Sequence, residues 1–353
     1  MLENNIKKDS VSLAKAIGII LMVLAHTFFS KFGDTFINMF HMSIFFFCAG
    51  FCFNEANLVD FKGFAKKRLK GLYFPYIKWS LFFLLLHNVL FRLNIYNSEF
   101  GFMGRVSQKY ELSDFFMKSI HLVTRMFDHE QLLGGFWFLR CLFIVSFLGY
   151  AFIKYSNIKK NYIFVFFALL CGAILASYFD IHVPIVGVGS KELIALLVFL
   201  VGYLCKNKKN TLSLRNVPFA IIVALIGSFL WPMSYLSVTW WKIIPWVTSS
   251  VLCTMAIIEL CQLLDKRKFV FKSILVYIGN NTLSILALHF LCFKIVSLLI
   301  ICIHNLSIKR LAEFPVIQDY TVKGWWIVYL VIGVIFPISF NMVFHRISRG
   351  LNA

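Results

Sequence analysis

Residues 11–30 read VSLAKAIGIILMVLAHTFFS, a stretch of 20 residues in which only Lys15 and His26 are ionisable. A helix of roughly 20 mostly apolar residues crosses the hydrocarbon core of a bilayer, so this stretch predicts a membrane-spanning helix. Lys15 and His26 are close to three helical turns apart, which puts them on one face and roughly 16 Å apart along the axis. Ionisable side chains inside a membrane span are costly and mark candidate functional sites.

The rest of the chain continues this apolar pattern. Of its 353 residues, 60% are hydrophobic and 14% are charged, against roughly 25% charged residues in soluble proteins. We therefore expect an all-α polytopic membrane bundle of about ten transmembrane helices, forming a single domain over residues 1–353. The second to tenth predicted spans are 36–53, 71–93, 134–153, 161–179, 191–205, 217–236, 243–263, 275–303 and 324–345. The span 275–303 is long enough to break near Gly279-Asn280, and the longest connection is an outer loop, 94–133.

The formal net charge of +19 has a distribution that predicts the orientation of the chain. If the N-terminus is cytoplasmic, the cytoplasmic segments carry 20 Lys/Arg and 5 Asp/Glu, whereas the opposite side carries 11 and 10. An excess of Lys and Arg in cytoplasmic loops is typical of membrane proteins. Both termini are therefore expected in the cytoplasm. The net positive charge is therefore explained by the orientation of the chain in the lipid membrane. A nucleic-acid partner is not expected.

Several ionisable residues are predicted to lie at one depth, in the outer half of the membrane. The rise per residue places His26, His41, His87 and Arg140 in this layer, and His289 joins it if the ninth span breaks. A polar cavity would explain the layer, whereas an interhelical hydrogen bond would also explain His26 and snorkelling to the interface would also explain Lys15.

Basic residues and cysteines complete the list of candidates. The run Lys66, Lys67, Arg68 and Lys70 either marks the cytoplasmic side or binds the phosphates of a cytoplasmic ligand. The 9 cysteines lie mainly in predicted spans. None of them has zinc-ligand spacing, so no metal site is expected.

Five motifs occur in an order that resembles the acyltransferase 3 family of membrane-bound bacterial O-acyltransferases. They are KAIGIILMVLAH (15–26), FHMSIFFFCAG (40–50), KRLKGLYFPY (67–76), FWFL (136–139) and YIGNNTLS (277–284) with His289 beyond it. The sequence departs from the family pattern at four positions. Ser12 stands where an acid is common, Gly71 where a second arginine follows Arg68, and Ser43 and Ala49 where proline and serine are usual.

The resemblance implies transfer of an acetyl group from cytoplasmic acetyl-CoA, a co-substrate rather than a bound cofactor, in the bacterial inner membrane. The acceptor would be a hydroxyl of a glycan, such as O-antigen, capsule, exopolysaccharide or a lipid-linked sugar. Lys66, Lys67, Arg68 and Lys70 would bind the coenzyme phosphates. His41, Arg140, Trp137 and His289 are candidates for oxyanion stabilisation or acceptor binding.

Two residues are the predicted catalytic groups. Lys15 would guide the coenzyme inward, and His26 would act either as a general base or as the carrier of an acyl-imidazole. A polysaccharide polymerase or a lipid-linked glycan flippase is the alternative function, because such proteins also have many spans and a long outer loop. Neither alternative explains why Lys15 and His26 are paired on one face.

Overall fold

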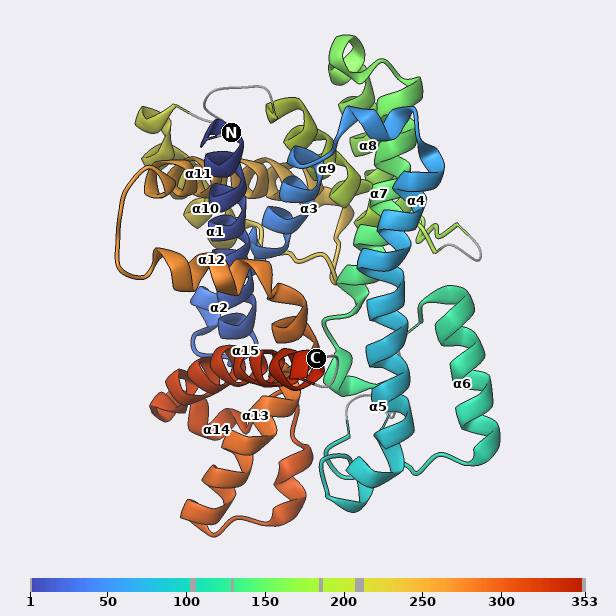
Figure 1. The fold of residues 1–353 in the computed structure, drawn as a ribbon, viewed down its shortest axis with the longest axis vertical. Coiled ribbons are helices and arrows are strands. Elements are labelled where there is room, and N and C mark those ends of the chain that lie inside the picture. Colours follow the sequence, from blue (N-terminus) through green and yellow to red (C-terminus); the bar gives the residue numbers. More distant parts are fainter. Residues whose placement is uncertain (1, 102–105, 128–129, 184–186, 207–212, 351–353) are drawn as a thin grey trace. The chain divides into compact units, whose positions relative to one another are not determined.

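The computed structural model describes residues 2–101, 106–127, 130–183, 187–206 and 213–350, with the side chains of residues 9–342 within these ranges. Helices dominate the described residues, and no strand forms among them (Figure 1). The predicted all-α class is therefore confirmed. The chain divides into two compact units: unit 1 is Met1–Gly18, Phe32–Leu72 and Phe138–Asn280, and unit 2 is Ile19–Lys31, Tyr73–Trp137 and Asn281–Ala353.

Most helices belong to unit 1, and the helix α1 contributes to both units. The helices of unit 1 are α1 (Leu2–Ala25) up to Gly18, α2 (Lys31–Asn38), α3 (His41–Phe51), α4 (Phe61–Arg68), α7 (Trp137–Tyr155), α8 (Ile158–Tyr178), α9 (Ser190–Cys205), α10 (Val217–Leu230), α11 (Ile243–Asp265) and α12 (Lys272–Asn280). Unit 2 contains the end of α1, α5 (Phe74–Arg92), α6 (Leu112–Arg125), α13 (Thr282–His304), α14 (Gln318–Tyr320) and α15 (Trp326–Gly350).

Seven helical segments of the described chain are long and apolar enough to cross a membrane. They are Lys31–Phe51, Phe61–Arg92, Trp137–Tyr155, Ile158–Tyr178, Trp240–Asp265, Thr282–His304 and Gln318–Met342. Three predicted spans lie outside this set: α1 carries Lys8, Asp9 and Lys15, and α9 and α10 have 16 and 14 residues. The chain is thus a helical membrane protein, while the count of ten spans and the cytoplasmic termini stay predictions.

Small residues allow close backbone contact between helices of unit 1. A Cβ added at Gly50 of α3 would lie 1.8 Å from the carbonyl oxygen of Phe199 in α9, and one added at Gly202 of α9 would lie 2.1 Å from the carbonyl oxygen of Phe47. Only glycine tolerates such an approach from both sides. Such small-residue contacts are a usual way for membrane helices to pack closely.

The predicted break in span 275–303 is confirmed. Helix α12 ends at Asn280 and α13 begins at Thr282, with Asn281 in a non-helical conformation (φ −115°, ψ 25°). Gly279 approaches α1 so closely that a Cβ there would lie 1.8 Å from the carbonyl oxygen of Ser12. The Ser12 hydroxyl also donates to the Asn280 side-chain oxygen at 2.8 Å. The break therefore coincides with a close contact between α12 and α1.

Unit 2 is built around the pair α13 and α15 and the pair α5 and α6. Phe293 of α13 packs where Gly333 of α15 leaves room, since a Cβ at Gly333 would lie 2.5 Å from its ring. The segment 94–133, predicted as an outer loop, contains α6 within its described residues. Residues 102–105 and 128–129 of this segment lie outside the described residues.

Candidate functional site

Two histidines far apart in the sequence meet in unit 2. His26 follows the last residue of α1, and its backbone N–H still donates to the Met22 carbonyl at 3.3 Å. The ring of His26 stacks on Phe290, with centroids 4.8 Å apart and an interplanar angle of 11°. The ring centroid of His289 lies 5.4 Å from that of His26. His26 is half-buried, whereas His289 is completely buried.

The hydrogen bonds of His289 fix which ring nitrogen carries the proton. Its Nδ1 lies 2.9 Å from the Ile285 carbonyl oxygen and 3.1 Å from that of Leu286. Carbonyl oxygens only accept, so Nδ1 carries the proton and Nε2 keeps its lone pair. This buried Nε2 has no hydrogen-bond partner among the described residues. An unsatisfied buried acceptor is costly, so this nitrogen is a candidate to receive a proton or a hydroxyl hydrogen bond from a ligand.

Aromatic rings and glycines surround the histidine pair. Phe314 packs on Phe290 with ring centroids 4.7 Å apart. A Cβ added at Gly134 would lie 3.4 Å from both of these rings, and one added at Gly135 would lie 2.8 Å from Leu286. Trp137 follows these glycines at the first residue of α7 and belongs to unit 2, as the histidines do. The segment before α7 therefore approaches the His289 helix through residues without bulky side chains.

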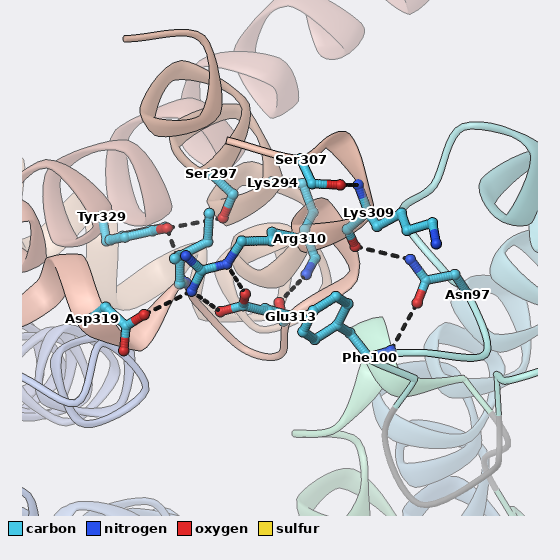
Figure 2. Close-up of polar contacts among 11 residues, drawn as sticks. Asn97, Phe100, Lys294, Ser297, Ser307, Lys309, Arg310, Glu313, Asp319 and Tyr329 are labelled. Carbon is cyan, nitrogen blue, oxygen red and sulfur yellow. Dashed lines mark hydrogen bonds and ion pairs between the residues drawn. The ribbon is translucent and has the colours of Figure 1, made fainter. Parts of the chain in front are cut away.

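A polar network ties the segment after α13 to that helix (Figure 2). Lys294 is only 4% exposed, and its Nζ donates to the Glu313 backbone carbonyl at 2.5 Å. The Glu313 carboxylate accepts from Arg310, which also donates to Asp319 at 2.8 Å. The Lys294 ammonium lies 5.9 Å from the centre of the Phe314 ring. Lys294 is thus hydrogen-bonded to the backbone of the segment after α13, beside the Phe314 ring.

A second cluster in unit 1 gathers positive charge around Cys52. Lys15, Arg68 and Lys206 all interact electrostatically with the Cys52 sulfur, which follows α3. Lys206 also donates from Nζ to the Phe53 carbonyl at 2.6 Å. These three cations come from α1, the end of α4 and the residue after α9, so they meet only in the folded chain.

Arg68 is distinct from the other members of the predicted basic run. Its guanidinium lies 5.3 Å from the centre of the Phe64 ring, and its buried Nε has no hydrogen-bond partner among the described residues. Lys66, Lys67 and Lys70 are exposed. Of the four predicted phosphate ligands, only Arg68 joins the cluster around Cys52.

Two other predicted site residues, His41 and Arg140, belong to unit 1. His41 donates from Nδ1 to the Ile37 carbonyl at 2.8 Å. Arg140 lies against Gly187, which has a φ of +63° and where a Cβ would be 2.4 Å from the Arg140 Nη2. Their convergence with His26 in one layer stays a prediction.

His87, the other member of the predicted layer, is buried in unit 2. Its Nδ1 lies 3.1 Å from both carboxylate oxygens of Glu130, and its Nε2 lies 3.0 Å from the Gln108 carbonyl oxygen. Each ring nitrogen thus lies within hydrogen-bond distance of an oxygen. Both nitrogens of His87 are therefore used within the protein.

The family model described as an acyltransferase domain matches residues 8–345, nearly the whole chain. The chain belongs to the acyltransferase 3 family. No curated relative and no solved structure matches it. The resemblance that the five sequence motifs indicated is thus confirmed.

The structure explains how this acyltransferase accommodates its departures from the family pattern. Ser12 takes the usual acid position and binds Asn280, as described above. Ser43 lies in a buried hydroxyl group, 2.9 Å from the Tyr235 OH and 2.6 Å from the Ser250 Oγ. A Cβ added at Gly71 would meet nothing within 4 Å. The missing second arginine is therefore not a consequence of crowding at that position.

Sequence reasoning missed two contributors to the acyltransferase's candidate sites. From the sequence, Lys206 is one of the predicted cytoplasmic charges, directly after the apolar stretch 191–205. Its position gives no sign that its side chain binds the Phe53 carbonyl. Cys52 was treated with the other cysteines as a small buried hydrophobe, yet its side chain is exposed. No pattern in the sequence indicates that its sulfur lies among three cations.

Proposed function

We propose that this acyltransferase moves an acetyl group from acetyl-CoA to a hydroxyl of a cell-surface or lipid-linked glycan in the bacterial inner membrane. The buried, unpartnered Nε2 of His289 beside the stacked ring of His26 carries the proposal. A pair of imidazoles in an apolar surrounding is suited to moving a proton during acyl transfer. Family membership favours acyl transfer over glycan polymerisation or flipping.

In the proposed reaction, the acceptor oxygen attacks the thioester carbonyl carbon as His26 takes the hydroxyl proton. The carbon–sulfur bond then breaks, and the proton passes from the imidazole to the departing coenzyme thiolate. The half-buried side chain of His26 is accessible to a substrate, whereas the buried His289 is suited to orienting it or sharing its proton. Formation of an acyl-imidazole on His26 would use the same residues in two steps.

The cationic cluster around Cys52 is the proposed site for the coenzyme phosphates. Guanidinium and ammonium groups are the usual phosphate ligands of proteins. The unpartnered Nε of Arg68 leaves a donor for a phosphate oxygen, and Lys15 and Lys206 add charge nearby. The separation of about 16 Å between Lys15 and His26, derived from the helical rise, stays a prediction of the sequence.

Substitution of the histidines tests the proposed chemistry. Expressed in a strain that lacks the enzyme, His26→Ala and His289→Ala are expected to abolish acetylation of the surface glycan, read by mass spectrometry. The control is His304→Ala, because His304 lies exposed at the end of the same helix α13. Normal acetylation by a stable His26→Ala variant would show that His26 is not catalytic. Shortened chains or accumulated lipid-linked precursor in the deletion strain would indicate a polymerase or a flippase instead.

Substitution in the cationic cluster tests donor binding. Arg68→Gln and Lys206→Gln are each expected to raise the KM for acetyl-CoA about tenfold, which corresponds to ~1.4 kcal/mol of lost interaction. Lys62→Gln is the matched control, since Lys62 is exposed on α4 and the KM should not change. An unchanged KM in both cluster variants would exclude the cluster from the donor site.

A further inference from the structure

Helix α6 lies alongside α5 and runs in the opposite direction (Figure 1). At one end, the Asn88 side chain binds both the backbone N–H and the carbonyl of Tyr110, at 2.8 and 2.9 Å. At the other end, the Tyr73 hydroxyl donates to the Val123 carbonyl and the Tyr76 hydroxyl to the Met126 carbonyl, each at 2.7 Å. The two helices are therefore aligned over their length and not only at one crossing point.

The length of this alignment is close to the thickness of a membrane core. From Tyr73 to Asn88 the chain rises about 22 Å at 1.5 Å per residue. The 14 residues of α6 rise about 21 Å by the same measure. Because Phe61–Arg92 is one of the segments suited to crossing a membrane, α6 extends over most of the depth that α5 spans.

The side chains of α6 are arranged as expected for a helix that faces lipid. Leu112, Phe116, Ile120 and Val123 share one face of α6, and all four are exposed, Phe116 at 68% and Leu112 at 86%. Such an apolar stripe exposed to water would be unusual. Phe82, Leu85 and Val89 of the neighbouring α5 are exposed as well.

The charged residues of α6 lie on the opposite face. Asp114, Lys118, His121 and Arg125 follow helical spacing there. The Lys118 ammonium lies 3.7 Å from an Asp114 carboxylate oxygen and 4.4 Å from the centre of the Tyr110 ring. Charged residues at membrane depth are tolerated where they turn away from lipid and find partners in the protein.

The segment after α6 returns inside the protein. Glu130, Gln131, Leu132 and Leu133 are at most 3% exposed, and Glu130 binds the buried His87 of α5. Irregular backbone at membrane depth is tolerated only where protein surrounds it or water reaches it. Met126 bonds to Tyr76 and Glu130 to His87, so by residue 130 the chain is again beside the second half of α5.

We propose that α6 is a re-entrant membrane helix whose apolar stripe, Leu112, Phe116, Ile120 and Val123, contacts the acyl chains of membrane lipid. It enters the bilayer beside α5, and by residue 130 the chain is back beside His87, near the end of α5 from which the segment started. The segment 94–133 would then be an intramembrane element and not an outer loop. Lipid is the occupant that the stripe fits, because α6 is aligned with α5 over most of the length of that membrane-spanning helix.

Cysteine labelling of the full-length protein in lipid nanodiscs tests this proposal. Phe116→Cys and Ile120→Cys are compared with Val59→Cys, a position that is 93% exposed in a connecting segment. Labelling is followed with a water-soluble maleimide, over the background of the parent protein. A thiol in hydrocarbon ionises poorly, so both α6 variants should react at least about tenfold more slowly than Val59→Cys, and all three should react equally fast in SDS. Equal rates in nanodiscs would overturn the proposal.

A photo-crosslinking residue at position 116 identifies what covers the stripe and does not depend on thiol chemistry. An adduct with the nanodisc phospholipid, detected by mass spectrometry, would support the proposal. A covalent dimer would show that a second copy covers the stripe, and incorporation of water alone would show an aqueous surface. Either of these results would overturn it. Neither experiment requires acetylation activity, so failure of the proposed enzymatic function would leave the result unaffected.

Discussion

Replacing Gly50 by alanine is expected to separate α3 from α9. The added Cβ would lie 1.8 Å from the Phe199 carbonyl oxygen, 2.7 Å from its carbonyl carbon and 3.0 Å from the Tyr203 nitrogen. All three atoms belong to the backbone of a long helix, so no side-chain rotation relieves the contact. The helices must move apart, and the buried contacts on both sides of the crossing weaken.

The expected magnitude follows from two opposing effects. Overpacking of this kind costs 1–3 kcal/mol, and a backbone contact this short calls for the upper end, about 3 kcal/mol. Alanine gains about 1 kcal/mol over glycine in helix propensity. The net cost is therefore about 2 kcal/mol, which corresponds to a fall in Tm of about 3 °C in a chain of this size.

The matched control is Gly71→Ala, because a Cβ at Gly71 would meet nothing within 4 Å. Thermal unfolding of the detergent-solubilised protein, followed by size-exclusion chromatography after heating, should give an unchanged or slightly raised Tm for the control. The ends of α3 and α9 carry Cys52 and Lys206, so Gly50→Ala should also raise the KM for acetyl-CoA. A Tm for Gly50→Ala equal to that of Gly71→Ala would refute the reasoning about the crossing.

Three further predictions concern buried and exposed polar contacts. Glu130→Gln should lower the free energy of unfolding by about 3 kcal/mol, because the His87 ring loses the carboxylate beside it. A lower Tm would be the measured result. Ser43→Ala should cost about 1–3 kcal/mol by depriving the buried Tyr235 hydroxyl of a partner, and an unchanged Tm would contradict this. Hydrogen bonds from Lys159 and then Tyr203 lower the pKa of Glu55. The ionised Glu55 therefore stabilises the fold at neutral pH, and this stabilisation is lost as the pH falls through the lowered pKa. Wild type and Glu55→Gln should therefore differ in Tm by a small amount at neutral pH and converge in acid.

The sequence predicted the class of fold because transmembrane helices are a local property. An apolar stretch of about 20 residues needs no partner to be recognised, and Gly279-Asn280 marked the break between α12 and α13 correctly. The segment 94–133 was harder to interpret. Its apolar residues follow helical spacing but are interrupted by charges, so the composition of α6 resembles that of a solvated loop.

The candidate sites were predictable only in part. The sequence singled out His26 and His289 because ionisable residues are rare in apolar spans, and Arg68 because it belongs to the basic run before the third predicted span. It could not indicate that the His289 Nε2 lacks a partner, since this depends on the carbonyls of Ile285 and Leu286. The role of Lys206 beside Cys52 depends on how α9 meets α3 at Gly50, which no residue spacing reveals.

The sequence by itself therefore determined that the chain is a helical membrane protein of the acyltransferase 3 family, because hydropathy and ordered motifs are read along the chain. Tertiary structure alone decided that the His26 ring stacks with Phe290 and His289, that Lys15, Arg68 and Lys206 come near Cys52, and that α6 lies along α5. The physical reason is that membrane helices are similarly apolar on many faces. Their rotation and spacing are set by close contacts such as those of Gly50, Gly202 and Gly279, and these contacts select which polar side chains meet.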